Sequence, residues 1–489
     1  MLYTNEMKIL LSDGSGLTAR QVARRLSESG HEVEALSPDW LCLCRFTGHV
    51  RRVRRVPSYG TDPLGWLDAA LAVYRRGGFE LLFPTQEQVA VLSHAAGRLA
   101  DTGVLTAVPS FEALRAVQDK VSASATLSAL GIPQPATAFL GSADDLRAWE
   151  SLPVFVKTPI GTATTGVRRI DSAAALGSCA DELEAAGAFA SAGGSASAGG
   201  SASADGPASA GGPASAGGPA SAGGPASAGG PGSAGGPGSG GGAGGPCGPG
   251  GKALGVIAQE PAAGPLVMVQ TVFAHGEMVA AHANVRVREG ARGGASHKRS
   301  LDHPATVVGH LESLGRSLRW HGGLSADAIL TGAGPVFIDI NPRLVEPGNA
   351  WHSGVDLVGA LVDAARGGAP GVQPPGRPGV ATHQLLLAIL GAAAQGRGRR
   401  GVAAEIRAAL THSGLYRGSA EELTPVHGDP RTALPVLMAA AALMVRPAVW
   451  RLLASGSVAG YALTPAGWDS LLSTQPCAPG HAPTSCSGR

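Results

Sequence analysis

The chain has 489 residues, which is too long for one ordinary hydrophobic core and long enough for two or three domains. Lysine and arginine (38) nearly balance aspartate and glutamate (36), so the net charge of +2 excludes a strong overall field for nucleic acid. The six cysteines show no CxxC spacing, and the N-terminus lacks the basic and apolar segments of a secretory signal. We therefore expect a cytoplasmic protein with no nucleic-acid partner.

Residues 8–36 predict a βαβ unit, and residues 1–108 are expected to form an open α/β sheet domain. A strand (KILLS) leads into a glycine turn (DGSGLTA), an amphipathic helix that ends at Gly30, and a second strand (HEVEAL). Glu34 lies 20 residues after Gly14, which is the spacing of a dinucleotide-binding fingerprint. A nicotinamide-dependent enzyme is therefore one alternative interpretation.

Residues 190–251 are almost only Gly, Ala, Ser and Pro, with GGPASA repeated. The paired glycines do not give the every-third-residue glycine of a collagen helix. With so few large apolar side chains, such a segment cannot offset the entropy of ordering. We interpret it as a flexible insertion without a catalytic part.

The C-terminal part, residues 366–489, is rich in Ala and Leu and is predicted to be largely helical. Its most apolar window runs from Leu434 to Val445 and ends at Arg446 and Pro447. About a dozen residues are too few for a membrane span, which needs roughly 20. The window predicts a buried or interfacial helix, and we expect no transmembrane span.

The strand VFIDINPR carries the side chains that best indicate chemistry. Asp339, Asn341 and Arg343 are spaced by two and therefore share one face of a strand. Pro342 cannot donate a ladder hydrogen bond, which indicates a strand end where these side chains can reach a ligand. An acid, an amide and a cation are thus predicted to converge.

A hairpin folded about Ala333 places Asp327 opposite Asp339, with β-carbons about 5 Å apart. Two facing carboxylates repel each other unless a hard divalent cation lies between them. The oxygen donors of the two aspartates and Asn341 suit Mg²⁺, with Mn²⁺ as an alternative ion. The competing interpretation is an edge hairpin with solvated acids.

The segment IDINPRLVEPGN resembles the metal-binding strand of ATP-grasp enzymes such as carbamoyl-phosphate synthetases and biotin carboxylases. The similarity spans about residues 105–365 without the insertion. It implies an α/β fold: an open-sheet N-terminal domain, a two-lobed ATP-grasp core over 109–365, and a helical C-terminal region. On this resemblance Asp327, Asp339 and Asn341 are metal ligands, Arg343 contacts the transferred phosphoryl group or the substrate, and Glu346 is a substrate-site acid.

The same resemblance implies a nucleotide site. Lys157 ends a strand before the loop GTATTG, whose ends are Gly161 and Gly166, and Lys120 resembles the second nucleotide lysine of the family. The strand LVMVQTVF resembles the hinge that binds adenine through its backbone. The expected contacts on this strand and the next are Gln270, Thr271 and Val272 for adenine and Glu277 for ribose.

Further positive charge is expected near the triphosphate or an acidic substrate. Arg286 and Arg288 alternate along one strand, and His297, Lys298 and Arg299 form a predicted cationic loop. Exposed charge without a function is an equally good interpretation of these residues.

The resemblance implies an ATP-dependent ligase that joins a small-molecule carboxylate to an amine through an acyl phosphate, releasing ADP and phosphate. Its cofactors are ATP and Mg²⁺. The sequence names neither the acid nor the amine, and it does not indicate an oligomeric state. A degenerate ATP-binding module that acts as a sensor or partner protein is the non-enzymatic alternative.

Overall fold

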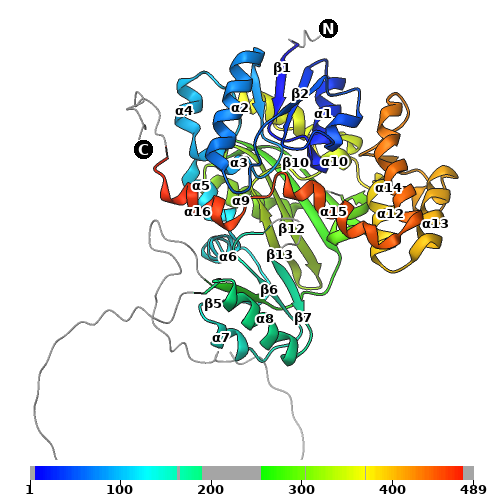
Figure 1. The fold of residues 1–489 in the computed structure, drawn as a ribbon. Coiled ribbons are helices and arrows are strands. Elements are labelled where there is room, and N and C mark those ends of the chain that lie inside the picture. Colours follow the sequence, from blue (N-terminus) through cyan, green and yellow to red (C-terminus); the bar gives the residue numbers. More distant parts are fainter. Residues whose placement is uncertain (1–5, 162–165, 190–254, 303, 369–370, 477–489) are drawn as a thin grey trace, which may run out of the picture. The chain divides into compact units, whose positions relative to one another are not determined.

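The computed structural model describes residues 6–161, 166–189, 255–302, 304–368 and 371–476 (Figure 1). The predicted insertion, 190–251, lies outside the described residues. The described residues on either side of it are close together, because the Gly255 amide donates to the Ala188 carbonyl at 2.8 Å. The α/β fold class is confirmed, whereas the division into three domains at residues 108 and 365 stays a prediction.

The first part of the chain forms a four-stranded parallel sheet in the order β3-β2-β1-β4. Strand β1 is buried along most of its length because helices cover both faces of the sheet (Figure 1). The predicted βαβ unit is confirmed, and Gly30, with φ of 89°, follows its helix. The elements are β1 (Lys8–Leu11), α1 (Leu17–Glu28), β2 (Glu32–Ser37), β3 (Arg52–Arg55), α2 (Pro63–Gly77), β4 (Leu81–Phe83), α3 (Val89–His94) and α4 (Ala96–Asp101).

Two helices then lead into a four-stranded antiparallel sheet in the order β5-β8-β6-β7. Asp119 separates the two helices by capping the second, accepting from the Ser122 amide at 2.8 Å. Helices α7 and α8 pack their apolar sides on this sheet. The elements are α5 (Phe111–Gln118), α6 (Lys120–Ala129), β5 (Thr137–Leu140), α7 (Ala143–Arg147), β6 (Val154–Lys157), β7 (Val167–Ile170), α8 (Ala173–Ala185) and β8 (Val256–Gln259).

A seven-stranded sheet follows, in the order β13-β12-β9-β10-β11-β14-β15. Apolar residues of α9 and of α11 reach this sheet in two separate core clusters. The elements up to α11 are β9 (Leu266–Ala274), β10 (Glu277–Glu289), β11 (Ala295–Ser300), α9 (Ala305–Ser317), β12 (Gly322–Thr331), β13 (Gly334–Asn341), α10 (Gly348–Ser353) and α11 (Leu357–Ala365).

Residues after 366 are largely helical, as predicted, but they also complete the seven-stranded sheet with β14 and β15. Helix α12 is buried on nearly all sides and is packed by α13, α14 and α15. None of the described helices is both long enough and apolar enough to cross a membrane. The elements are β14 (Ala381–His383), α12 (Leu385–Ala394), α13 (Gly398–Leu410), β15 (Ala420–Glu421), α14 (Ala433–Val445), α15 (Trp450–Ala459) and α16 (Pro465–Ser473).

Deleting residues 190–254 is expected to leave the melting temperature and ATP affinity nearly unchanged. The flanking residues Ala188 and Gly255 already touch, so a few glycines can join them, and loop entropy changes only slowly with length. Differential scanning calorimetry and titration with ATP would check this. Loss of folding on deletion would show that the segment is structural.

Candidate functional site

The two acids of the hairpin face each other, and the predicted pairing of Asp327 with Asp339 is confirmed. The turn alone does not produce it. Thr331 pairs with Gly334, and continuing that register would place Ile338 opposite Asp327. A β-bulge on the β13 side, next to Asp327, takes up one extra residue and brings Asp339 into register. The bulge also explains why Phe337 and Ile340, three residues apart, are both buried.

Electrostatics at this pair favour a bound cation. Burial and the facing Asp339 carboxylate raise the pKa of Asp327 to about 7, and Arg286 and Arg343 only partly offset this. Asn341 lies two residues beyond Asp339 on the same strand. Among the described residues, no group of three or more His, Cys, Asp or Glu side chains could hold a metal. Two carboxylates and an amide fit Mg²⁺, which takes its remaining ligands from phosphate and water.

Two lysines, one from the β5-β8-β6-β7 sheet and one from helix α6, lie close to the aspartate pair. The Lys157 ammonium on β6 donates to Gln259 Oε1 and to the Ile338 carbonyl, both at 2.7 Å. Burial lowers the pKa of Lys157 to about 8, although Asp339 raises it. Lys120 Nζ lies 3.9 Å from Asp339 Oδ1 and donates to the Gly161 carbonyl at 3.0 Å. Both predicted lysines are therefore beside the aspartate pair.

The ends of the predicted phosphate loop are held close together. The Thr158 amide donates to the Gly166 carbonyl at 2.8 Å. Gly166 has φ of 78°, and a Cβ there would lie 2.2 Å from Thr158 Oγ1, so a side chain is excluded on both counts. Gly161 is tied to Lys120, as described above, and residues 162–165 of the loop lie outside the described residues.

Arg343 is paired with an acid that the sequence did not indicate. Its Nε and Nη2 lie 3.2 and 2.9 Å from Glu87 Oε1, and both side chains are buried. Burial opposes the charge of Arg343, but Glu87 raises its pKa. Glu87 lies in the loop after β4 of the N-terminal sheet. It thereby fixes the arginine at the end of β13, two residues beyond Asn341.

Glu346 belongs to a buried network around one lysine. Lys298 Nζ lies 2.6 Å from Glu346 Oε2 and 2.6 Å from Glu422 Oε1, and Gln384 donates to both carboxylates. Burial lowers the pKa of Lys298, but the two glutamates outweigh burial and raise it. The prediction of a cationic loop at 297–299 is wrong, because these residues lie in β11, between β10 and β14.

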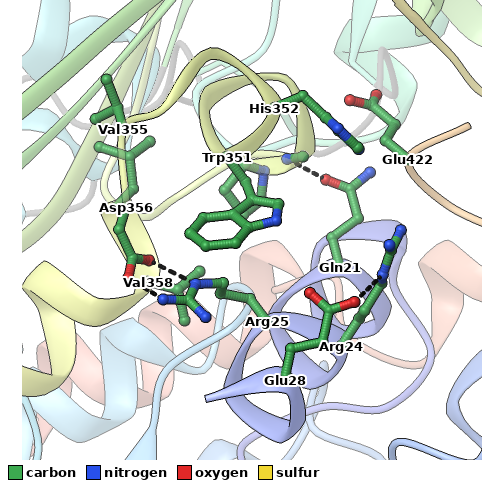
Figure 2. A pocket seen from close by; sticks show the side chains of 13 residues that line it. Gln21, Arg24, Arg25, Glu28, Trp351, His352, Val355, Asp356, Val358 and Glu422 are labelled. Carbon is green, nitrogen blue, oxygen red and sulfur yellow. Dashed lines mark hydrogen bonds and ion pairs between the residues drawn. The ribbon is translucent and has the colours of Figure 1, made fainter. Parts of the chain in front are cut away.

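A small groove lies between α1 and α10, and Figure 2 shows side chains that line it. Its cavity has a volume of about 20 Å³, which is room for one water molecule. Across it, Arg25 pairs with Asp356 at 2.5 Å and lies 3.7 Å from the centre of the Trp351 ring. The Gly348 amide donates to Gln21 at 2.7 Å. These contacts fix α1 against the segment that follows Glu346.

The sequence matches no protein-family model and no curated protein. Solved structures do match its fold. The biotin carboxylase domain of Hydrogenobacter thermophilus 2-oxoglutarate carboxylase, with MgADP, ADP and bicarbonate, is 14% identical with a TM-score of 0.51, covering 77% of this chain and 74% of that one. Campylobacter jejuni biotin carboxylase is 15% identical, with a TM-score of 0.51 and the same coverage. An ADP complex of Staphylococcus aureus N5-carboxyaminoimidazole synthetase is 12% identical, with a TM-score of 0.50, covering 78% and 82%. The chain has the ATP-grasp fold.

The strand that the sequence predicted as an adenine hinge lies in the interior of the seven-stranded sheet. Gln270, Thr271 and Val272 lie inside β9, which pairs with β10 on one side and β12 on the other. Their backbone groups are therefore engaged in two ladders, and all three residues are buried. The expectation that they bind adenine through the backbone is wrong.

Glu277, the predicted ribose contact, also lies far from the aspartate pair. It pairs with Ala274, whereas Asp327 pairs with Met268 on the same strand. Ala274 lies six residues after Met268, which corresponds to about 20 Å along β9. Glu277 therefore lies at the far end of the sheet from the aspartate pair.

The connection between the two sheets of the ATP-grasp fold runs from Glu260 to Pro265, directly after β8 and before β9. Gln259, which precedes it, accepts from Lys157, and the segment opens at the same end of β9 as Met268 and Asp327. The run QEPAAGP marks this break, because proline and glycine end strands.

The dinucleotide alternative is disfavoured by Asp13. Its Oδ2 accepts from the Ser15 and Gly16 amides at 2.8 and 2.7 Å, where a pyrophosphate would lie in a nucleotide-binding turn. Burial raises the pKa of Asp13 to about 6, and these amides partly offset the rise. Glu34 is likewise engaged, with Arg54 Nε at 2.5 Å.

Proposed function

We propose that this protein is an ATP-dependent ligase that activates a small-molecule carboxylate as an acyl phosphate and passes it to an amine. The observation that carries the proposal is the meeting of Lys157 and Lys120, from one sheet and its helix, with Asp327 and Asp339 from the other sheet. The fold supports it, because one structure of similar fold is a complex with MgADP, ADP and bicarbonate.

In this proposal the chain mainly positions and neutralises charge, as phosphoryl transfer requires. Asp327, Asp339 and Asn341 would hold Mg²⁺, which neutralises phosphoryl oxygens when bound. The ammonium groups of Lys120 and Lys157 hold phosphate oxygens by charge-assisted hydrogen bonds. We place adenine on the connection 260–265, between the two sheets.

The acceptor side of the site is built from the end of β13 and its partners. Arg343, oriented by Glu87, lies two residues beyond Asn341 at this strand end. It would stabilise negative charge on the carboxylate or on the phosphoryl group in transit. Glu346, anchored by Lys298, is the substrate-site acid of the proposal.

A screen of carboxylate and amine pairs for ADP release, with MgATP, tests the proposal. Turnover that requires both an acid and an amine is the expected result. ATP hydrolysis that no amine accelerates would contradict the ligase assignment. Binding of MgATP without turnover on any pair would instead favour the degenerate ATP-binding module.

Lys157→Ala is expected to weaken ATP binding by about 10-fold or more, because a charge-assisted phosphate contact is lost. The apolar neighbours Val154 and Val156 remain buried, so the chain should still fold. Isothermal titration with ATP measures the effect. Lys8→Ala, at a lysine that pairs with Glu32 on the N-terminal sheet, is the control and should keep the wild-type affinity. Equal affinities for both variants would remove Lys157 from the nucleotide site.

A further inference from the structure

Helix α14 has two apolar faces, and only one of them is covered. Its thirteen residues, ALPVLMAAAALMV, include no charged side chain. Val436, Ala439, Ala440 and Leu443 pack into the core that α12 and α13 share with it. The other face is exposed: Leu437 is 63% accessible, Met438 55% and Val445 75%. The full exposed set is Leu434, Leu437, Met438, Ala441, Met444 and Val445.

These six residues, which we call the α14 stripe, follow the three-and-four spacing of one helix face. The stripe extends for about 16 Å along the helix, at 1.5 Å per residue. A continuous row of large exposed apolar side chains marks an interaction surface rather than scattered surface residues. The helix is therefore buried on one face and exposed on the other, so the sequence expectation of a fully buried helix, one of two alternatives, does not hold.

The charged residues at the two ends of the α14 stripe are positive. Exposed Arg431 lies two residues before the first residue of the helix, and exposed Arg446 directly follows the last. Arg399 of α13 donates to the Val445 carbonyl at 2.7 Å, so its guanidinium lies at the C-terminal end of the stripe. The sequence has no acidic residue from Pro430 to Trp468. An apolar row with arginines at both ends favours an anionic partner.

A second copy of the chain does not meet this requirement. Antiparallel pairing of two α14 stripes would bring Arg431 of one copy toward Arg446 of the other, and parallel pairing would bring identical arginines together. Like charges that face each other across an interface are unfavourable. A bilayer surface with anionic headgroups has no such conflict, since it accepts apolar side chains below the headgroups and arginines among them.

We propose that the α14 stripe docks the protein on an anionic membrane surface as a peripheral, non-spanning contact. Leu437, Met438 and Val445 enter the interface, while Arg399, Arg431 and Arg446 meet lipid phosphates. Each arginine contributes about fivefold to the partition coefficient at low salt, and this contribution falls as salt rises. Docking is independent of the nucleotide site, which is formed by other elements.

Co-sedimentation of the full-length protein with lipid vesicles tests the proposal. Binding to vesicles of phosphatidylglycerol and phosphatidylcholine is expected to exceed binding to phosphatidylcholine alone by about tenfold or more, and to weaken with salt. The double variant Leu437→Glu/Met438→Glu should lose about tenfold or more of that binding. Val372→Glu, at a residue 74% exposed and outside α14, is the matched control and should bind like wild type.

Thermal melts and the MgATP-induced melting shift should be the same for all three proteins, which shows that each is folded. Failure of the wild type to bind anionic vesicles would overturn the proposal, and so would equal binding of the double variant. Sedimentation velocity of the wild type and the double variant tests whether a second copy of the chain covers the α14 stripe. A wild-type dimer that the double variant abolishes would show that a second copy, rather than lipid, covers the α14 stripe.

Discussion

Asp339→Asn is expected to abolish most of the thermal stabilisation that MgATP gives to the wild type, and to lower metal-dependent turnover by about 100-fold or more. The change keeps the shape of the side chain but removes one of the two facing carboxylates. Asp327 alone then holds the ion with Asn341. Thermal melts with and without MgATP, together with ADP release, measure both effects.

The same variant is expected to be slightly more stable than the wild type without metal, by about 1 kcal/mol or less. Burial and Asp339 raise the pKa of Asp327 to about 7, so the wild type loses stability as pH rises from about 4 to about 7. Replacing Asp339 removes the repulsion but leaves Asp327 buried, so this pH dependence should become weaker without disappearing. Magnesium competes with the proton on Asp327, so metal affinity of the wild type should rise through about pH 7.

Asp68→Asn is the matched control, because Asp68 is an exposed acid that pairs with Arg98 on the N-terminal helices. It should keep the full MgATP-induced shift and show no gain in stability without metal. If Asp339→Asn also kept the full shift, the aspartate pair would not be the metal site. The edge-hairpin interpretation with solvated acids would then be preferred.

Local sequence was enough to predict the hairpin and its two acids, because strand alternation and a short turn are encoded within about 20 residues. It could not reveal the β-bulge before Asp339, since Ile338 fits an ordinary strand equally well. The hinge error has a similar cause. LVMVQTVF is a good strand, but its sequence does not say that neighbours lie on both sides of it.

The partners of the functional side chains were missed for a different reason. Glu87 lies 256 residues before Arg343, and Glu422 lies 124 residues after Lys298. Such pairs depend on how separate elements pack, and no local pattern specifies them. The burial of Lys298 could not be predicted from the sequence either. The residues of β11 are mostly polar, as in an exposed segment, but β11 is an inner strand because β14 pairs with its free edge.

Lys298→Met is expected to lower the free energy of unfolding by about 3–5 kcal/mol at pH 7 to 8. The lysine is the cation between Glu346 and Glu422, and it is buried with them. Methionine fills similar space but leaves two buried carboxylates without their cation. Urea denaturation measures the loss. Lys8→Met, which breaks a partly exposed pair with Glu32 at 3.4 Å, should cost about 1 kcal/mol or less.

The pH dependence separates this electrostatic cause from simple loss of packing. Burial already raises the pKa of Glu422, and Lys298 opposes that rise. Without the lysine the folded protein should bind protons more strongly than the unfolded chain, so the stability deficit should shrink as pH falls below 7. Glu422→Gln added to Lys298→Met should recover part of the loss at pH 8, because one of the two buried charges is removed while Gln384 keeps an acceptor.

A stability deficit that is the same at pH 5 and pH 8, and that Glu422→Gln does not reduce, would mean that Lys298 contributes volume rather than charge. In that case Glu346 would be held at the end of β13 by its backbone bond to Thr18, at 3.1 Å, rather than by the lysine.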